Sequence, residues 1–254
     1  IKKKLEKFIN KNIKSGQDIC LHTDLIKLNK IFEFKSPKQL FNFTNQLFTS
    51  KTRTLLLPAF SFSWGADSKS KIYDKKNSKS KLGFISEYIR KNKIAPRTND
   101  PMFSFYIFGK KKNYMHFKDD TFGKGSIFES MHKNNCKIVM LNTNNFGPTF
   151  IHYIEQYYND NFEKIGYRYK KNFFGTIKNS NRLKQNKTVV FSRKMKNNLI
   201  FNDKKILQLL KKNKKINKIK FNNMNISSVD SNDLFFYGVR GLIKDKFFFV
   251  ENEK

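Results

Sequence analysis

The chain has 254 residues, enough to bury a large hydrophobic core, and no stretch of it is apolar over the length needed to cross a membrane. Its formal net charge of +32 would indicate nucleic acid or an anionic membrane as a partner if the charge were concentrated in one place. The lysines are instead spread over nearly every segment, and Lys, Asn, Ile and Phe are the residues that A/T-rich codons encode, so codon bias is a sufficient explanation. Under either explanation the charge attracts anionic ligands and repels strongly cationic ones.

The first residues and the cysteines bear on the cellular compartment. The sequence starts at Ile1 with a charged, helix-like segment that lacks the features of a secretory signal. The two cysteines, Cys20 and Cys136, belong to no CxxC pattern and lie in strand-like surroundings. We therefore expect buried thiols in a reducing compartment, with a disulfide between them as the less favoured alternative, and a cytoplasmic protein.

Helix-like and strand-like segments alternate along the chain, which favours a layered α/β fold. Hydrophobic periodicity and helix-start signals predict helices at residues 2–15, 36–49, 83–91, 128–134, 148–159 and 203–212. Short apolar or alternating runs predict strands at residues 18–22, 54–58, 103–108, 137–141 and 189–192, and short Phe-rich strands around Gly238 and Gly241.

Two further features concern loops and domains. The polar residues 61–81 predict a mobile loop, in which Trp64 is either a stacking residue for adenine or a sugar, or an exposed anchor. The last third of the chain changes in texture. We expect a core formed by residues 1–180 and a small C-terminal α+β extension, residues 181–254, packed on that core.

The segment GPTFIHYIE, residues 147–155, sets a histidine and a carboxylate three residues apart near the start of a predicted helix. Positions three apart project on the same side of a helix, so Glu155 could hold the imidazole of His152 in one tautomer and stabilise its protonated form. The pair also follows a predicted buried strand, where α/β sheets usually place their chemistry. A surface helix with an incidental ion pair shows the same spacing. The pattern alone therefore makes His152 only a candidate general base.

Six segments, in chain order, resemble the aminoglycoside 3-N-acetyltransferase family. They are LHTDL at 21–25, LPAFS at 57–61, GFISEYIR at 83–90, RTNDP at 97–101 with FSF at 103–105 and Gly109, FGKGS at 122–126, and TFIHYIE at 149–155. Residues 167–170, residues 174–177 and the Asp100-Pro101 loop look closest to family members associated with bacterial surface-polysaccharide synthesis. The resemblance implies a three-layer α/β/α fold with a mixed central sheet, and acetyl transfer from acetyl-CoA to an amine without a metal.

The resemblance also implies roles for individual residues. His152 matches the general base and Glu155 the carboxylate that orients it. The donor to the developing oxyanion stays open, with backbone N–H groups near Thr149 or in the Phe60-Ser61 turn as candidates. The residues expected to line the acetyl-CoA site are His22, Thr23, Asp24, Leu25, Pro58, Phe60, Ser61, Arg97, Thr98 and Ser104. Arg97 suits phosphate oxygens, and the alternative is a residue that stabilises its loop by hydrogen bonds.

Two departures from the family pattern bear on the acceptor. Asp100 stands where the antibiotic-modifying members usually have His, and Asn142 replaces a common Gly. An aminoglycoside is a polycation, and the net charge of this protein repels polycations. We therefore expect the acceptor to be an amino sugar, an intermediate of surface-glycan synthesis, with an aminoglycoside antibiotic as the alternative.

Other classes of function stay open from the sequence. A nucleic-acid-binding protein would stack bases on Phe and Tyr among lysines, although no RRM, KH, zinc-finger or helix-turn-helix pattern is visible. A metal hydrolase would need His152, Glu155 and one of His22, His116 or His132 as ligands. A degenerate homologue without activity is a third alternative, against which the presence of His152 and Glu155 argues. Peripheral association with an anionic membrane and a monomeric or homodimeric state are compatible with the sequence.

Overall fold

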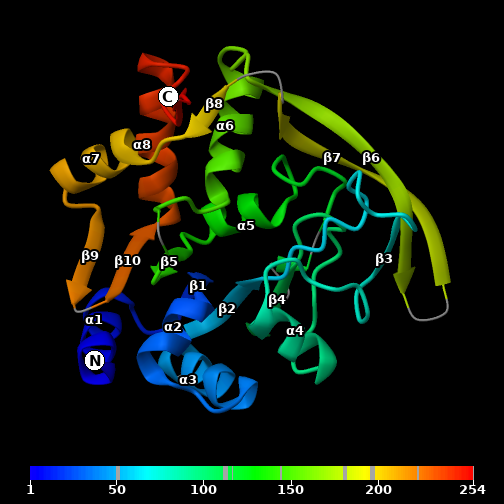
Figure 1. The fold of residues 1–254 in the computed structure, drawn as a ribbon. Coiled ribbons are helices and arrows are strands. Elements are labelled where there is room, and N and C mark those ends of the chain that lie inside the picture. The colour runs from blue at the N-terminus through cyan, green and yellow to red at the C-terminus, as the bar shows by residue number, and fades with distance from the viewer. Residues whose placement is uncertain are drawn as a thin grey trace.

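The computed structural model describes residues 1–49, 52–110, 114–115, 117–143, 145–179, 182–194, 198–221 and 223–253, except for the side chain of Leu25. Its centre is a six-stranded sheet in the order β4-β2-β1-β5-β10-β9 (Figure 1). The strands are β1 (Gln17–Thr23), β2 (Thr52–Pro58), β4 (Phe105–Gly109), β5 (Lys137–Leu141), β9 (Ile216–Phe221) and β10 (Met224–Asp230). β1 runs parallel to β2 and to β5, whereas the pairs β2–β4, β5–β10 and β9–β10 are antiparallel. The mixed central sheet that the family resemblance implies is confirmed.

Helices cover both faces of this sheet (Figure 1). One face carries α1 (Lys2–Asn12), α2 (Leu25–Phe32), α3 (Pro37–Thr49) and α4 (Phe84–Lys91). The other carries α5 (Ile127–Lys133), α6 (Phe150–Asn161), α7 (Lys204–Lys212) and α8 (Ser231–Lys244). Because side chains alternate along a strand, Ile19 and Leu21 of β1 enter the first core, and Cys20 between them enters the second.

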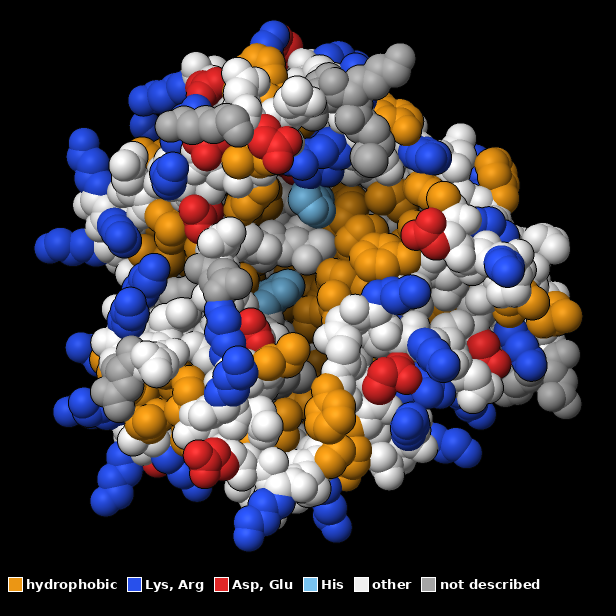
Figure 2. Space-filling model, in the orientation of Figure 1, with side chains coloured by type: hydrophobic (Ala, Val, Ile, Leu, Met, Phe, Trp, Pro, Cys, Tyr) orange, Lys and Arg blue, Asp and Glu red, His pale blue; other side chains and the backbone are white. Residues whose placement is uncertain are grey.

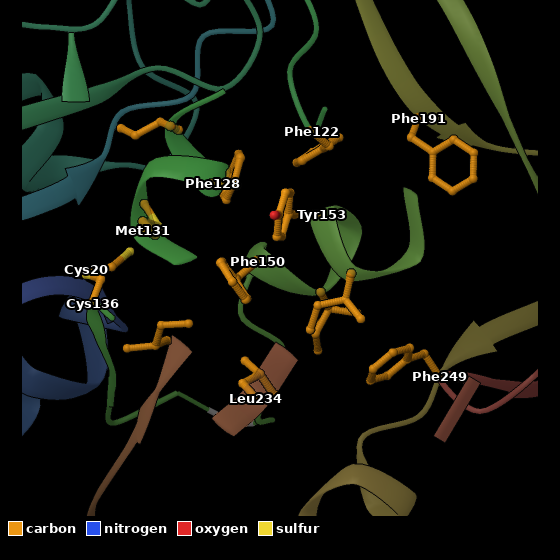
Figure 3. Close-up of a cluster of buried hydrophobic side chains, with 14 of the residues drawn as sticks. Cys20, Phe122, Phe128, Met131, Cys136, Phe150, Tyr153, Phe191, Leu234 and Phe249 are labelled. Carbon is orange, nitrogen blue, oxygen red and sulfur yellow. The ribbon is translucent and has the colours of Figure 1, made fainter. Parts of the chain in front are cut away.

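The second core is rich in aromatic side chains (Figure 3). Phe128 comes from α5, Phe150 and Tyr153 from α6, and Phe191 from β7 (Arg182–Arg193). Cys20 and Cys136 are also buried in this core as free thiols, as the sequence predicted. The core therefore fixes the position of α6, the helix that carries His152 and Glu155.

Two smaller sheets complete the fold. β6 (Arg168–Asn179) and β7 (Arg182–Arg193) form a long curved hairpin, and β3 (Ile72–Asp74) pairs with β6 (Figure 1). β8 (Leu199–Phe201) pairs with β11 (Val250–Asn252). Within the part of the chain that the structure describes, no helix combines the length and the apolar character that crossing a membrane requires.

Two predictions about local structure were wrong. The Phe-rich strands expected around Gly238 and Gly241 are instead the helix α8, and the two glycines let it pack closely: a Cβ on Gly241 would lie 2.5 Å from the ring of Phe248. Residues 61–81 are not simply a polar loop, because they contain β3 and because Trp64 is only 2% exposed. Its indole packs against Gly175 of β6, where a Cβ would lie 2.4 Å from Nε1. Trp64 is therefore a core residue and not an exposed anchor.

The predicted division of the chain at residue 180 stays a prediction. Residue 180 lies between β6 and β7, which pair along their whole length. β9 and β10, from the last third of the chain, are strands of the central sheet. Both halves of the chain therefore build the same layers.

Candidate active site

The candidate active site lies at the start of α6, after the carboxyl end of β5. At Asn142 the chain turns with φ of 58°, in the left-handed region where glycine is most easily placed and Asn is tolerated. The N–H of Asn142 donates to the carbonyl of Asn225 at 2.7 Å, which ties the turn to β10. This backbone conformation explains why Asn142 can replace the Gly that is common at this position.

α6 begins in a tight turn and presents His152 and Glu155 on one side. The N–H of His152 donates to the carbonyl of Thr149 at 3.0 Å, and the Thr149 side chain makes no capping hydrogen bond. His152 Nδ1 lies 3.0 Å from Glu155 Oε2, so the pair expected from the spacing does form. The side chain of His152 is 28% exposed and that of Glu155 only 1%. The base can thus reach a ligand, while the carboxylate cannot.

Two residues that the sequence argument did not assign a role hold Glu155 in place. Tyr167 donates its hydroxyl hydrogen to Glu155 Oε1 at 2.9 Å, and Arg168 Nε lies 2.8 Å from Oε2 as an ion pair. Arg168 also donates from Nη1 to the carbonyl of Phe191 on β7 at 3.2 Å. In the sequence, Tyr167 and Arg168 are marked only by lying in residues 167–170, a segment that resembles the family. The resemblance implies no role for either residue.

These contacts set the protonation states of the pair. Although burial by itself raises the pKa of a carboxyl group, the charge of Arg168 and the hydrogen bonds from His152 and Tyr167 lower the pKa of Glu155 to about 2. An ionised carboxylate only accepts hydrogen bonds, so Nδ1 of His152 carries the hydrogen and Nε2 keeps its lone pair. Burial lowers the pKa of His152, and the charge of Arg168 lowers it further, against the opposing effect of Glu155. His152 is therefore a neutral base at neutral pH.

Aromatic side chains line the site next to the imidazole. The ring of Phe122 meets that of His152 edge to face, with the centroids 5.3 Å apart, and Phe103 packs on Phe122 at 4.9 Å. Figure 2 shows two histidine side chains at the wall of a hollow, beside a hydrophobic surface and with lysines and arginines around it.

Gln156, the residue after Glu155 on α6, donates to Asp120 Oδ2 at 2.8 Å. This hydrogen bond anchors the loop before α5 to α6.

Two adjoining cavities lie at the sheet edge where the parallel strands β1, β2 and β5 end. The larger, of about 930 Å³, lies between the starts of α2, α3 and α4. The smaller, of about 440 Å³, reaches Gly147, close to the start of α6. Both are lined by Thr23, Leu82 and Thr143, which makes them neighbours. The predicted coenzyme residues found on one or both cavities are His22, Thr23, Asp24 and Pro58.

Arg97 is placed differently from the expectation that its guanidinium faces coenzyme phosphates. The residue is only 2% exposed, and its Nε donates to Ser104 Oγ at 2.9 Å. Its two terminal nitrogens donate to the backbone carbonyls of Ser78 and Ala59. The guanidinium also lies over the ring of Tyr73. All three guanidinium nitrogens therefore already have protein partners. These contacts favour the alternative, in which Arg97 stabilises its loop by hydrogen bonds.

The other predicted coenzyme residues of this region are also inside the fold. Thr98 Oγ1 accepts from the N–H of Phe105 at 2.9 Å, and Ser104 Oγ donates to the carbonyl of Ala59 at 2.8 Å. Ser61 Oγ donates to the carbonyl of Pro101 at 3.0 Å, and Phe60 is 5% exposed among aromatic rings. Neither side chain of the Phe60-Ser61 turn is therefore exposed to a ligand. Leu25 begins α2, and its side chain lies outside the described part of the chain.

Two of the histidines proposed as extra metal ligands, His22 and His132, have other neighbours. His22 Nε2 lies 3.6 Å from Cys20 Sγ, and burial lowers the pKa of His22 to about 4. His132 stacks on Phe235 with the ring centroids 3.9 Å apart, and His116 lies outside the described residues. Among the residues that the structure does describe, no three His, Cys, Asp or Glu side chains are grouped as they would be around a metal ion.

The lowered pKa of His152 predicts the acid limb of the pH profile. For a base that must be neutral, kcat/KM falls as pH drops through its pKa, so we expect a midpoint below the ordinary value of 6.5. Arg168→Gln removes a positive charge that disfavours the imidazolium, and it should raise this midpoint. Lys170→Gln is the matched control, because Lys170 pairs with Asp160 at 2.7 Å and not with the site. A midpoint above 6.5 in the unaltered protein, or equal shifts in both variants, would contradict the assignment.

Comparisons with known proteins identify the family of this chain. Residues 46–242 match the family model described as aminoglycoside 3-N-acetyltransferase. A search of curated protein sequences finds no match. The structure is similar to that of the aminoglycoside acetyltransferase AAC(3)-IVa as an apoenzyme, with a TM-score of 0.69 and 16% identity over 98% of this chain and 90% of that chain.

Two further solved structures were determined with ligands. AAC-IIIb in a binary complex with CoASH has a TM-score of 0.69 and 14% identity, over 96% of each chain. AAC-VIa bound to sisomicin has a TM-score of 0.70 and 14% identity, over 95% of this chain and 96% of that chain. At such identities these similarities establish the fold. Because the family model matches more than half of the sequence, the chain belongs to the aminoglycoside 3-N-acetyltransferase family, a family of N-acetyltransferases whose acyl donor is acetyl-CoA.

Proposed function

We propose that this protein transfers an acetyl group from acetyl-CoA to the amino group of an amino sugar, an intermediate of surface-glycan synthesis, with His152 as general base. The observation that carries the proposal is the 3.0 Å contact between His152 Nδ1 and Glu155 Oε2. Glu155 is held from its other side by Tyr167 and Arg168. The contact leaves Nε2 as the basic nitrogen, on a side chain that is partly exposed.

The proposed reaction uses that nitrogen once. An ammonium group must lose a proton before its nitrogen can attack, and Nε2 of His152 accepts the proton of the acceptor amine. The nitrogen then forms a bond to the thioester carbonyl carbon, and the carbonyl electrons move onto oxygen. As the oxyanion collapses, the carbon–sulfur bond breaks, the imidazolium gives its proton to the departing CoA sulfur, and the new amide nitrogen loses its remaining extra proton to solvent. Glu155 stabilises the imidazolium during the interval in which it is charged.

Thr149 is the proposed donor to the oxyanion. It precedes α6 directly, and its hydroxyl is not used for capping. The start of a helix also carries partial positive charge, which favours a developing anion there. Thr149 thus offers both a backbone N–H and a hydroxyl near the base.

The two adjoining cavities are the proposed site of acetyl-CoA. The 930 Å³ cavity is large enough for the nucleotide end, and Lys30 and Lys35 line it as cations suited to phosphate groups. The 440 Å³ cavity leads from Thr23 towards Gly147 and would hold the pantetheine arm. In this orientation the thioester approaches Thr149 and His152. The solved complex of AAC-IIIb with CoASH supports this donor, since that protein shares the fold.

The preference for an amino-sugar intermediate rests on charge. The net charge of +32 opposes a polycation unless the pocket is locally acidic. Asp100 does not supply an exposed charge, because it is 3% exposed and its Oδ1 accepts from the N–H groups of Met102 and Phe103. Burial also raises the pKa of Asp100 to about 6. An aminoglycoside is the second candidate, since AAC-VIa was solved with sisomicin bound.

The test is release of free CoA thiol from acetyl-CoA with a panel of acceptors. Nucleotide-linked and phosphorylated amino sugars should give a kcat/KM at least tenfold above that of sisomicin and kanamycin. His152→Ala is the control for background CoA release in the absence of the general base. Faster acetylation of the aminoglycosides would overturn the preference for glycan intermediates, and absence of CoA release with every amine would overturn the proposed function.

A further inference from the structure

Arg193 lies on the same face of the hairpin as Arg168, the arginine that pairs with Glu155. It is the last residue of β7, and in the β6–β7 register it lies directly opposite Arg168, the first residue of β6. Directly opposed residues of an antiparallel pair project from the same face of the sheet. Since Arg168 reaches Glu155 from that face, the side chain of Arg193 leaves the hairpin towards the same end of the site.

The two arginines differ in their partners. Arg168 is neutralised by the carboxylate of Glu155 at 2.8 Å. The Nε of Arg193 is buried, and among the described residues it has no hydrogen-bond partner. Nor does any ion pair within the described ranges include Arg193, whereas Lys170 and Lys178 of the same hairpin pair with Asp160 and Asp74. A partly buried guanidinium without an anion is costly to the protein, which indicates that a ligand supplies the anion.

Electrostatics supports the closeness of Arg193 to the reacting group. The charge of Arg193 lowers the pKa of His152, and it opposes the rise that burial causes in the pKa of Tyr167. The N–H of Lys194, the next residue, donates to the carbonyl of Tyr167 at 3.0 Å, which ties the end of β7 to the segment that holds Glu155. Arg193 is thus placed at the rim of the site and is fixed relative to His152 through the backbone.

We propose that Arg193 binds an anionic group of the acceptor, a phosphate or a carboxylate attached to the amino sugar, and so selects anionic amino sugars over neutral and polycationic ones. This inference rests on the proposed function, and it assigns the residue that would recognise the acceptor. A guanidinium offers two parallel N–H donors, which match the paired oxygens of phosphate and carboxylate groups. A polycationic acceptor would instead meet an uncompensated positive charge next to the base.

The test compares acceptors that differ by one anionic group. We would measure kcat/KM for glucosamine, glucosamine 6-phosphate and a 2-amino-2-deoxyuronic acid at saturating acetyl-CoA. The quantity of interest is the ratio of each anionic acceptor to glucosamine. Loss of a charged hydrogen-bonding partner should lower that ratio by about ten- to one-hundredfold in Arg193→Gln, and Arg193→Lys should restore part of it. The acceptor whose ratio falls more identifies phosphate or carboxylate as the preferred anion.

The control is Lys187→Gln, which removes the same charge from an exposed position on β7. Its ratio should equal that of the unaltered protein. Equal loss for all acceptors in Arg193→Gln, or an equal change of the ratio in Lys187→Gln, would overturn the inference. If the unaltered protein acetylates none of these amines, the proposed function fails, and binding of glucosamine 6-phosphate by calorimetry still decides the role of Arg193: binding weakened by Arg193→Gln supports it, and unchanged binding or none rejects it.

Discussion

His152→Ala should lower kcat by about 10² to 10⁴, the range that a positioned general base contributes. The substitution removes Nε2 of His152. This is the ring nitrogen that can accept a proton, because Nδ1 is bound to Glu155. It does not remove a residue of either proposed acetyl-CoA cavity. We therefore expect acetyl-CoA to bind within about threefold of its original affinity, measured by calorimetry, while release of CoA thiol nearly stops.

A second histidine provides the matched control. His132→Gln removes an imidazole from α5 that is stacked on Phe235 and hydrogen-bonded to Tyr153, and that has no role in the proposed reaction. Its turnover should stay within about threefold, apart from any loss of folded protein, which circular dichroism quantifies. Added imidazole should partly restore His152→Ala, because that variant leaves space beside Phe122. More than a tenth of the original kcat in His152→Ala would remove His152 from the role of base.

Glu155→Ala should affect both turnover and folding. The side chain of Arg168 is 9% exposed, so loss of its partner leaves a buried and unpaired charge. Breaking such a pair costs about 3–5 kcal/mol in the free energy of unfolding, which urea denaturation can measure. The kcat should fall by at least about a hundredfold, because the imidazole of His152 loses the partner that fixes its tautomer and stabilises its charge.

Two further variants separate the catalytic effect from the structural one. In Glu155→Leu with Arg168→Met, both charges are removed together, so most of the stability should return while turnover stays low. Glu6→Ala is the surface control, since its pair with Lys2 is exposed and should contribute less than about 1 kcal/mol. Turnover that recovers together with stability in the double variant would show that Glu155 acts only on the fold.

Much of the layered fold could be predicted because local patterns determine it. The buried strands that became β1, β2 and β5 have short apolar runs, and α4, α5 and α7 have helical periodicity, so the predicted and observed positions agree closely. α8 could not be predicted in this way. Its glycines are typical of turns in isolation, and only the close contacts with Ile154 and Phe248 explain them as helix residues. The hairpin β6–β7 was recognised only in part, because most of its residues are exposed and polar and show little alternation.

The sequence by itself determined the pair at the centre of the site. Helical geometry places residues three apart on one side, so His152 and Glu155 meet wherever the helix is packed. Only the tertiary structure decided which partners surround them. Arg168 and Tyr167 reach Glu155, and Arg97 is held inside the fold, because strand register and packing between distant segments set those contacts. Long-range contacts of this kind leave no periodic pattern in the chain, whereas a contact within one helix does.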